Sequence, residues 1–153
     1  MSILPETEAS VSAGPWVAIS EEPIDPSVVL ARVGDPADGA VLLFLGTVRN
    51  HAEGQHVDGL HYEAYLPMAE KVLRQLAEEM CARLGTDRIA VVHRLGTLEV
   101  GEVSVAVAVS SPHRTEAFAT ASTLMEELKR RVPIWKHERY ESGRAAWVEG
   151  HPR

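Results

Sequence analysis

Cysteine, lysine and long apolar segments are all scarce in this chain of 153 residues. Its single cysteine, Cys81, excludes an intramolecular disulfide and any zinc site built from several cysteines. No segment approaches the roughly 20 consecutive apolar residues that span a bilayer. The N-terminus lacks both the basic region and the apolar region of a secretory signal peptide. We therefore expect a cytoplasmic protein that does not cross a membrane.

Charge is distributed unevenly along the chain. Residues 1–38 contain seven acidic residues and one basic residue, whereas residues 39–153 contain fifteen acidic and fourteen basic residues. The total net charge of −7 argues against non-specific binding to nucleic acid, which needs a basic surface. Residues 1–14 show no hydrophobic periodicity and are predicted to form a flexible acidic tail. The rest, residues 15–153, is expected to form a single domain.

Hydrophobic periodicity predicts strands that alternate with helices. Continuous or alternating apolar residues predict the strands 16–19, 40–48, 57–66, 89–95, 103–109, 134–140 and 146–148. Helical spacing predicts helices over 26–33 and 67–84, and a third that Ser111 and Pro112 begin and Pro133 ends. Residues 50–55 and 96–101 are predicted to be a loop and a turn-rich link. This order indicates an α+β fold, with a mainly antiparallel sheet packed against about three helices.

The distribution of lysine suggests a function. The chain has twelve arginines but only Lys71, Lys129 and Lys136, and the last two lie seven residues apart. Lys129, in the last turn of a predicted helix, complements the helix dipole, and so do the two arginines that follow it. That explanation does not extend to Lys136, which follows the helix-breaking Pro133. Such a corner can direct both ammonium groups into one pocket, where lysine can act as acid, base, nucleophile or counter-charge. From the residues alone, a structural role for the pair stays open.

Two further segments suit an anion. Ser111-Pro112-His113-Arg114 lies where a strand gives way to a helix, so that free backbone N–H groups and the positive end of the helix dipole meet a histidine and an arginine. Arg49 follows a buried strand directly, close to a glycine that permits near approach of a ligand. The alternatives are a plain helix cap with an exposed arginine, and an arginine at a strand end in solvent.

Other polar residues indicate structural roles. His51, His56 and His61 are spaced five residues apart, which matches no common zinc or iron site. His93 ends an apolar strand and is expected to be a hydrogen-bonded core residue. Cys81 falls on the apolar face of a predicted helix, so we expect a buried thiol rather than a nucleophile. No metal site is predicted.

Taken together, these motifs resemble the large, catalytic subunit of molybdopterin synthase. The resemblance runs in order from about Gly39 to Trp147, and the combination of HR, LK and PIWK is highly specific. The matching segments are Phe44–Arg49, Tyr62–Tyr65, Pro67–Ala69, His93–Gly96, Gly101–Glu102, Ser110–Arg114, Ala117–Phe118, Leu128–Lys129 and Val132–Lys136.

The resemblance implies an α/β-hammerhead type of fold and a central homodimer, with a small ubiquitin-like sulfur-carrier subunit at each end of a heterotetramer. The carrier would insert a C-terminal Gly-Gly tail that ends in a thiocarboxylate. The implied reaction is sulfur transfer to cyclic pyranopterin monophosphate, which forms the dithiolene of molybdopterin without a cofactor. Two sulfurs require two carriers per substrate and a half-sulfurated intermediate.

The resemblance also implies roles for individual residues. Lys129 and Lys136 match the catalytic lysines, and our hypothesis is that Lys136 orients the thiocarboxylate while Lys129 acts as acid or base on the pterin, or the reverse. Preorganised cations would stabilise the negative charge that develops during transfer. The substrate-binding residues implied are Arg49 at a strand end, His113 and Arg114 for the phosphate, Phe44 and Met125 as apolar pocket residues, and Thr47, Val48, His137 and Glu138 for added backbone contacts.

Two departures from the family pattern concern the C-terminal end. Gly143 and Trp147 lie four residues apart instead of three, which predicts a hairpin one residue longer. The sequence ends six residues after Trp147, so the basic residue that longer tails supply across the dimer would have to be His151 or Arg153, if either. The alternative function is a non-catalytic dimeric adaptor that binds a ubiquitin-like tail or a phosphorylated metabolite.

Overall fold

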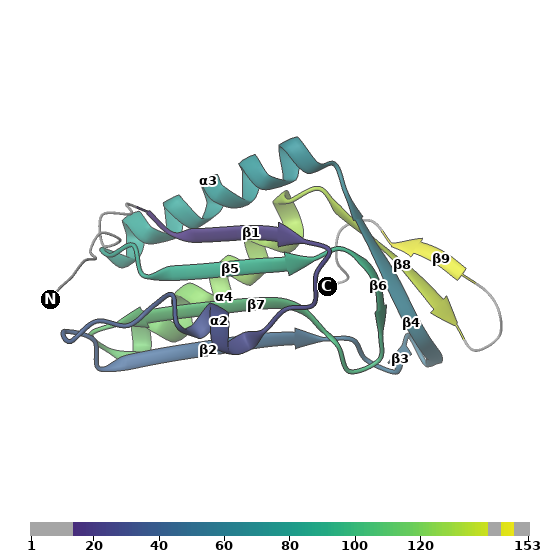
Figure 1. Ribbon diagram of the computed structural model, residues 1–153, viewed down its shortest axis with the longest axis horizontal. Helices are drawn as coiled ribbons and strands as arrows, with labels where there is room; N and C mark the ends of the chain where they lie inside the picture. The colour runs from purple at the N-terminus through teal and green to yellow at the C-terminus, as the bar shows by residue number, and fades with distance from the viewer. Residues whose placement is uncertain (1–13, 141–144, 149–153) are drawn as a thin grey trace, which may run out of the picture.

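The chain is built around a four-stranded sheet. The computed structural model describes residues 14–140 and the backbone of 145–148. The strands β1 (Trp16–Ser20), β5 (Ile89–Arg94), β7 (Val103–Ser111) and β2 (Ala40–Thr47) form the sheet in that order (Figure 1). β1 pairs with β5 in parallel, and the other two pairings are antiparallel. β5 and β7 form the centre and are buried almost throughout, as expected of apolar strands covered on both faces.

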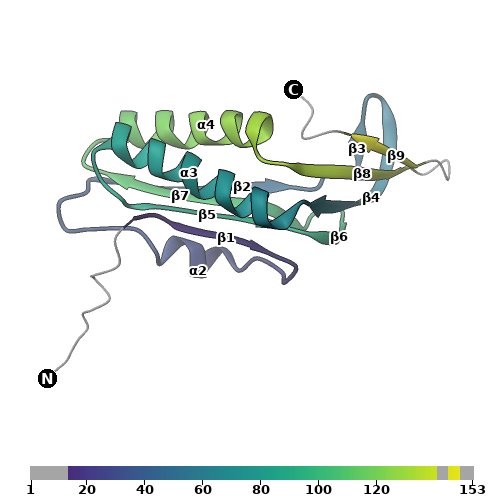
Figure 2. The same ribbon diagram turned by 90° about the horizontal axis from the view of Figure 1, so that it is seen from above.

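Two long helices cover one face of this sheet and a short helix covers the other. α3 (Leu66–Leu84) and α4 (Arg114–Arg131) lie side by side on one face, and α2 (Pro26–Leu30) lies on the opposite face (Figure 2). Leucines at helical spacing bury the inner faces of the two long helices: Leu73, Leu76, Leu124 and Leu128 are fully buried. Gly85, with φ of 86°, ends α3, and its N–H donates to the Cys81 carbonyl oxygen.

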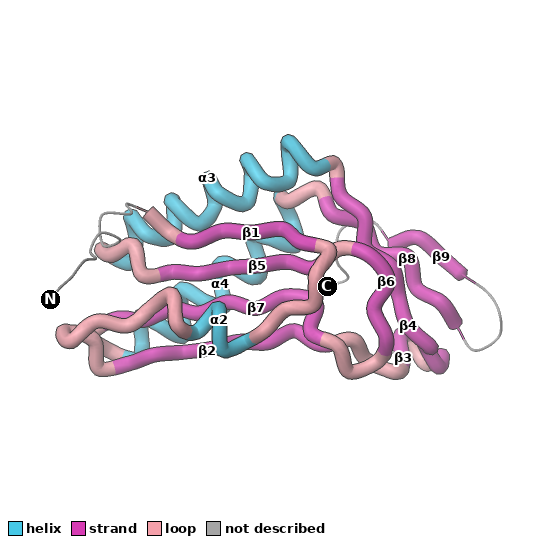
Figure 3. Tube along the Cα trace, in the orientation of Figure 1, coloured by secondary structure: helices cyan, strands magenta, loops and turns pink. Residues whose placement is uncertain are grey.

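A second sheet crosses the end of the first (Figure 3). It contains β3 (His51–Ala52), β4 (Gln55–Ala64), β8 (Ile134–Tyr140) and β9 (Ala145–Val148), and β6 (Gly96–Glu99) also pairs with β4. All of its pairings are antiparallel. The predicted α+β class, the mainly antiparallel sheets and the three helices are confirmed among the described residues.

Several predicted boundaries were wrong. Residues 51–52 and 96–99, expected in a loop and a turn, form strands because they pair with β4. β3 pairs through a two-residue hairpin turn at Glu53 and Gly54, whereas β6 pairs with a segment distant in sequence. The helix predicted over 26–33 ends at Leu30, although Asp25 caps it as expected by accepting from the Ser27 N–H at 3.0 Å. The predicted tail, Gly143, His151 and Arg153 lie outside the described residues. Within the described part of the chain, no helix is long and apolar enough to cross a membrane.

Candidate functional site

The site forms where α4 ends and β8 begins. Lys129 lies exposed in the last turn of α4, and Val132 ends that helix with its N–H donating to the Leu128 carbonyl oxygen at 3.0 Å. Pro133 then turns the chain into β8, which carries Lys136. β8 pairs along its length with β4, so Lys136 lies opposite Tyr62. The predicted helix-to-strand corner is therefore present, and it brings the second lysine into the core.

Lys136 is buried among charges of both signs. Its Nζ lies 3.3 Å from Oε2 of Glu138, and both side chains are only 8% exposed. Burial lowers the pKa of Lys136, the Glu138 carboxylate partly offsets this, and the positive charges of Arg49 and Lys129 lower the pKa further. Two predicted cations, Arg49 and Lys129, thus act electrostatically on the third, although they come from different parts of the chain. Such a site stabilises negative charge in a region poor in water.

Arg49 follows the end of β2 next to an anchored residue. Val48 is 5% exposed, its N–H donates to the Glu102 carbonyl oxygen at 3.0 Å, and its own carbonyl accepts from the Gly101 N–H at 2.9 Å. These bonds fix the strand end from which Arg49 projects. The backbone of Val48 is therefore fixed, while Thr47 lies exposed at the end of the strand.

His137 and Glu138 contribute differently from the expected backbone contacts. β8 lies between β4 and β9, so the backbone of both residues belongs to the sheet ladder. Glu138 takes part through its side chain, which pairs with Lys136 and accepts from the Tyr140 hydroxyl at 2.7 Å. Period-two spacing of Lys136, Glu138 and Tyr140 in a predicted strand was the available signal for this contact, and our sequence reasoning missed it.

The predicted phosphate pair lies at the other end of α4. His113 is the N-cap residue and Arg114 the first residue of the helix, and both are exposed. Fifteen residues separate Arg114 from Lys129, which at a rise of about 1.5 Å per residue places them about 22 Å apart. One copy of the chain therefore does not bring the phosphate pair to the lysines.

The expected cap at this helix start was wrong. Ser111 belongs to β7, and its hydroxyl donates to the His113 carbonyl oxygen at 2.6 Å instead of accepting from the first turn. His113 makes no side-chain cap bond either. Neither Ser111 nor His113 therefore caps the first N–H groups of α4 with its side chain, and N–H groups at a helix start suit an anion.

The predicted apolar pair, Phe44 and Met125, lies on two different elements. Phe44 on β2 is 39% exposed, and Met125 on α4 is half-buried against the main core. These two elements, α4 and β2, pack against each other. The two arginines after Lys129, expected to complement the helix dipole, also have carboxylate partners: Arg130 pairs with Glu127, and Arg131 makes a two-pronged bond to Glu79.

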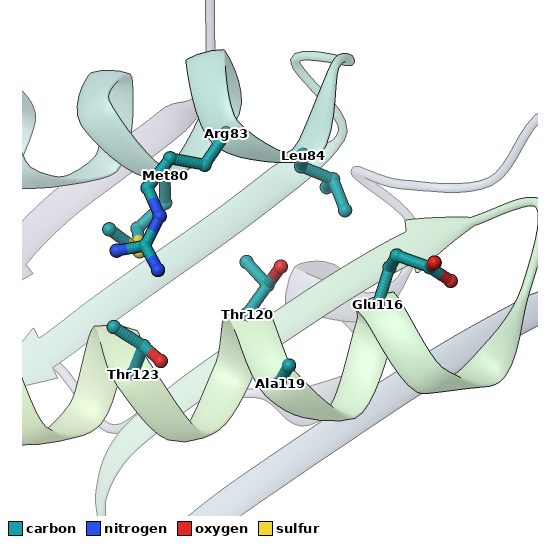
Figure 4. Close-up of a pocket in the computed structure, with 7 residues that line it drawn as sticks. All are labelled: Met80, Arg83, Leu84, Glu116, Ala119, Thr120 and Thr123. Atoms are coloured by element: carbon teal, nitrogen blue, oxygen red, sulfur yellow. The ribbon is translucent and has the colours of Figure 1, made fainter.

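Two other features of the described residues do not carry the site. A hollow of about 170 Å³ lies between α3 and α4, where Arg83 and Leu84 face Glu116 and Thr120 (Figure 4). It contains none of the predicted site residues. No group of three or more histidine, cysteine or carboxylate side chains suited to a metal ion occurs in the described ranges.

Comparisons with known proteins identify the family of this chain. The family model "MoaE protein" matches residues 19–131. A molybdopterin synthase catalytic subunit from Nostoc sp. is 40% identical over 152 residues, which cover 96% of this chain and 92% of that protein.

Solved structures are also similar. Molybdopterin synthase from Staphylococcus aureus matches with a TM-score of 0.80 at 39% identity, covering 87% of this chain and 96% of that one. A chain from the complex of subunits 1 and 2 of molybdopterin-converting factor from Helicobacter pylori matches with a TM-score of 0.67 at 20% identity, over 90% and 91% of the two chains, and shares the fold. This chain belongs to the MoaE protein family, whose members include molybdopterin synthase catalytic subunits.

Proposed function

We propose that this chain is the catalytic subunit of a molybdopterin synthase. It would transfer sulfur from the thiocarboxylated C-terminal tail of a small ubiquitin-like subunit to cyclic pyranopterin monophosphate. The observation that carries the proposal is the buried Lys136, with Arg49 and Lys129 as neighbouring cations. The membership of the family and the similarity to named catalytic subunits support it. We place the reaction in the cytoplasm, as the composition predicts.

The cations match the charges of the proposed reaction. The carrier's tail is anionic before transfer, as a thiocarboxylate, and after it, as a carboxylate. Lys136 is placed to orient that tail, because its ammonium lies in a water-poor region where a charge interaction is strong. Lys129, exposed beside it, is placed to serve as acid or base on the pterin. Arg49 adds a fixed positive charge at the end of β2.

The phosphate of the substrate is assigned to His113 and Arg114. They lie at the N-terminus of α4, where backbone N–H groups and the helix dipole favour an anion. Because about 22 Å separates them from the lysines of the same chain, the phosphate pair would complete the lysine site of a second copy. The proposed assembly is therefore a homodimer with one small subunit for each copy, and the Helicobacter pylori relative was itself solved as a complex of two subunits.

Product formation with a thiocarboxylated carrier and cyclic pyranopterin monophosphate tests the proposal. We expect molybdopterin from the unaltered chain, and a loss of about 10²–10³-fold in rate for both Lys129→Ala and Lys136→Ala, because each removes a preorganised charge. Lys71→Ala is the matched control, since Lys71 is exposed on α3 and is not among the charges that act on Lys136. Retained carrier binding without any product in the unaltered protein would instead favour a non-catalytic adaptor.

Mixing two inactive variants tests the shared site. If each site combines the lysines of one copy with the phosphate pair of another, a mixed dimer of Lys136→Ala and Arg114→Ala contains one intact site. Activity should then reappear after the subunits exchange. Activity that stays absent in verified mixed dimers would contradict a site built from two copies.

A further inference from the structure

The buried face of β8 carries a row of three polar side chains. Alternate residues of a strand point to the same face, and Lys136, Glu138 and Tyr140 are all less than a tenth exposed. Of the two intervening residues, Arg139 is exposed and His137 is half-buried. Polar groups are costly to bury unless they are paired, so a buried row of this kind requires an explanation.

The three side chains form a continuous chain of contacts. The Tyr140 hydroxyl donates to Oε1 of Glu138 at 2.7 Å, and Oε2 of the same carboxylate lies 3.3 Å from Nζ of Lys136. A carboxylate held at both oxygens is restricted in its rotation. The ring of Tyr140 is itself fixed, because it packs in a small apolar cluster with Ala52 and Val57. Tyr140 therefore anchors the carboxylate from the side opposite the lysine.

The groups around Lys136 explain why its ammonium depends on the Glu138 carboxylate. Arg49, after β2, and Lys129, on α4, both disfavour a further positive charge at this position. Tyr62 on β4 lies opposite Lys136. Burial raises the pKa of the Tyr62 hydroxyl to about 12, and this hydroxyl is hydrogen-bonded to Ser104. Among the described groups that act on Lys136, Glu138 is the one that favours the charged ammonium.

We propose that Tyr140 is a positioning residue for sulfur transfer, because its hydroxyl holds the Glu138 carboxylate in the orientation that keeps the Lys136 ammonium in place at the site. The inference rests on the proposed function of Lys136. Tyr140 itself acts through Glu138 and is not assigned a contact with the substrate.

Kinetics of single and double variants test this chain of contacts. Tyr140→Phe keeps the packed ring and removes the hydroxyl; we expect kcat to fall about tenfold, as on loss of one hydrogen bond to a charged group, with KM for the pterin little changed. Glu138→Gln should cost more. The double variant should be no slower than Glu138→Gln alone, because Tyr140 acts through that carboxylate. Tyr65→Phe is the matched control, since Tyr65 is 59% exposed and should leave kcat unchanged.

Direct titration of Lys136 provides a readout that does not depend on sulfur transfer. With only three lysines, protein labelled with ¹³C at lysine Cε gives three signals, and Lys136→Arg identifies the one of interest. Relative to the unaltered protein, the titration midpoint of Lys136 should fall in Glu138→Gln and fall by less in Tyr140→Phe. It should be unchanged in Tyr65→Phe.

The two measurements separate the possible failures. A Lys136 titration in Tyr140→Phe identical to that of the unaltered protein would overturn the inference, and so would additive losses in the double variant. If the unaltered protein makes no molybdopterin, the proposed function fails, while the titration still decides whether Tyr140 controls Lys136 through Glu138.

Discussion

His93 makes the stability of this protein depend on pH in a way that the structure predicts. The side chain lies on β5 with 0% exposure, and its ring meets that of Tyr62 edge-on at 4.8 Å between centroids. Nδ1 lies 2.8 Å from the Arg94 carbonyl oxygen. Because a carbonyl only accepts, Nδ1 carries the proton. This hydrogen bond by itself raises the pKa of His93, and it is burial that favours the neutral ring.

The size of the effect follows from the shifted pKa. Burial lowers the pKa of His93 from 6.5 to about 4. Between pH 6.5 and about pH 4, His93 is therefore protonated in the unfolded chain but neutral in the folded chain. This contribution to stability is fully present above about pH 6.5 and is lost as the pH falls toward 4. At about 1.36 kcal/mol per pKa unit, the loss amounts to about 3 kcal/mol, a large part of the stability of an ordinary domain.

Urea unfolding near pH 7 and near pH 4 measures the contribution of His93 to the unfolding free energy. The unaltered protein should lose about 3 kcal/mol more of its unfolding free energy between the two conditions than His93→Gln loses. Carboxylates whose pKa is lowered by arginine partners, such as Asp38 beside Arg88 and Glu102 beside Arg94, contribute equally in both proteins and cancel. His51→Gln, at an exposed position, should follow the unaltered protein. Parallel pH curves for His93→Gln and the unaltered protein would refute the reasoning.

Two further predictions concern the core and the sheet junction. Burial, with Asp87 and Glu78 nearby, raises the pKa of the Cys81 thiol to about 11, so its thiolate fraction is about a hundredfold lower than that of an ordinary thiol. The native protein should therefore react with Ellman's reagent far more slowly than the urea-unfolded chain. Equal reaction rates would contradict this prediction. A Cβ on Gly59 would lie 2.8 Å from the Leu98 carbonyl oxygen and 2.6 Å from Nη2 of Arg139, so Gly59→Ala should destabilise the protein by about 1–3 kcal/mol. A melting temperature unchanged by that substitution would show that β4 can shift away from β6.

The same residues show how far sequence reasoning reaches. The spacing of apolar residues predicted the three helices and most of the long strands, because each of these elements buries one continuous face. The turn from α4 into β8 was predictable because Pro133 ends a helix locally. β3 and β6 were missed because they are short and exist only through pairing with β4.

The candidate site likewise has one part that the sequence predicts and another part that only the structure shows. By itself the sequence determined which residue types stand at which positions: the isolated lysine pair, the strand-end arginine and the histidine–arginine pair at a helix start. Only the tertiary structure decided which of them meet, because contacts between distant segments depend on how the sheets pair and not on local spacing. It placed Arg49 and Lys129 where their charges act on Lys136. It also placed Arg114 about 22 Å from Lys129, at the far end of α4, and linked Tyr140 to Lys136 through a buried carboxylate.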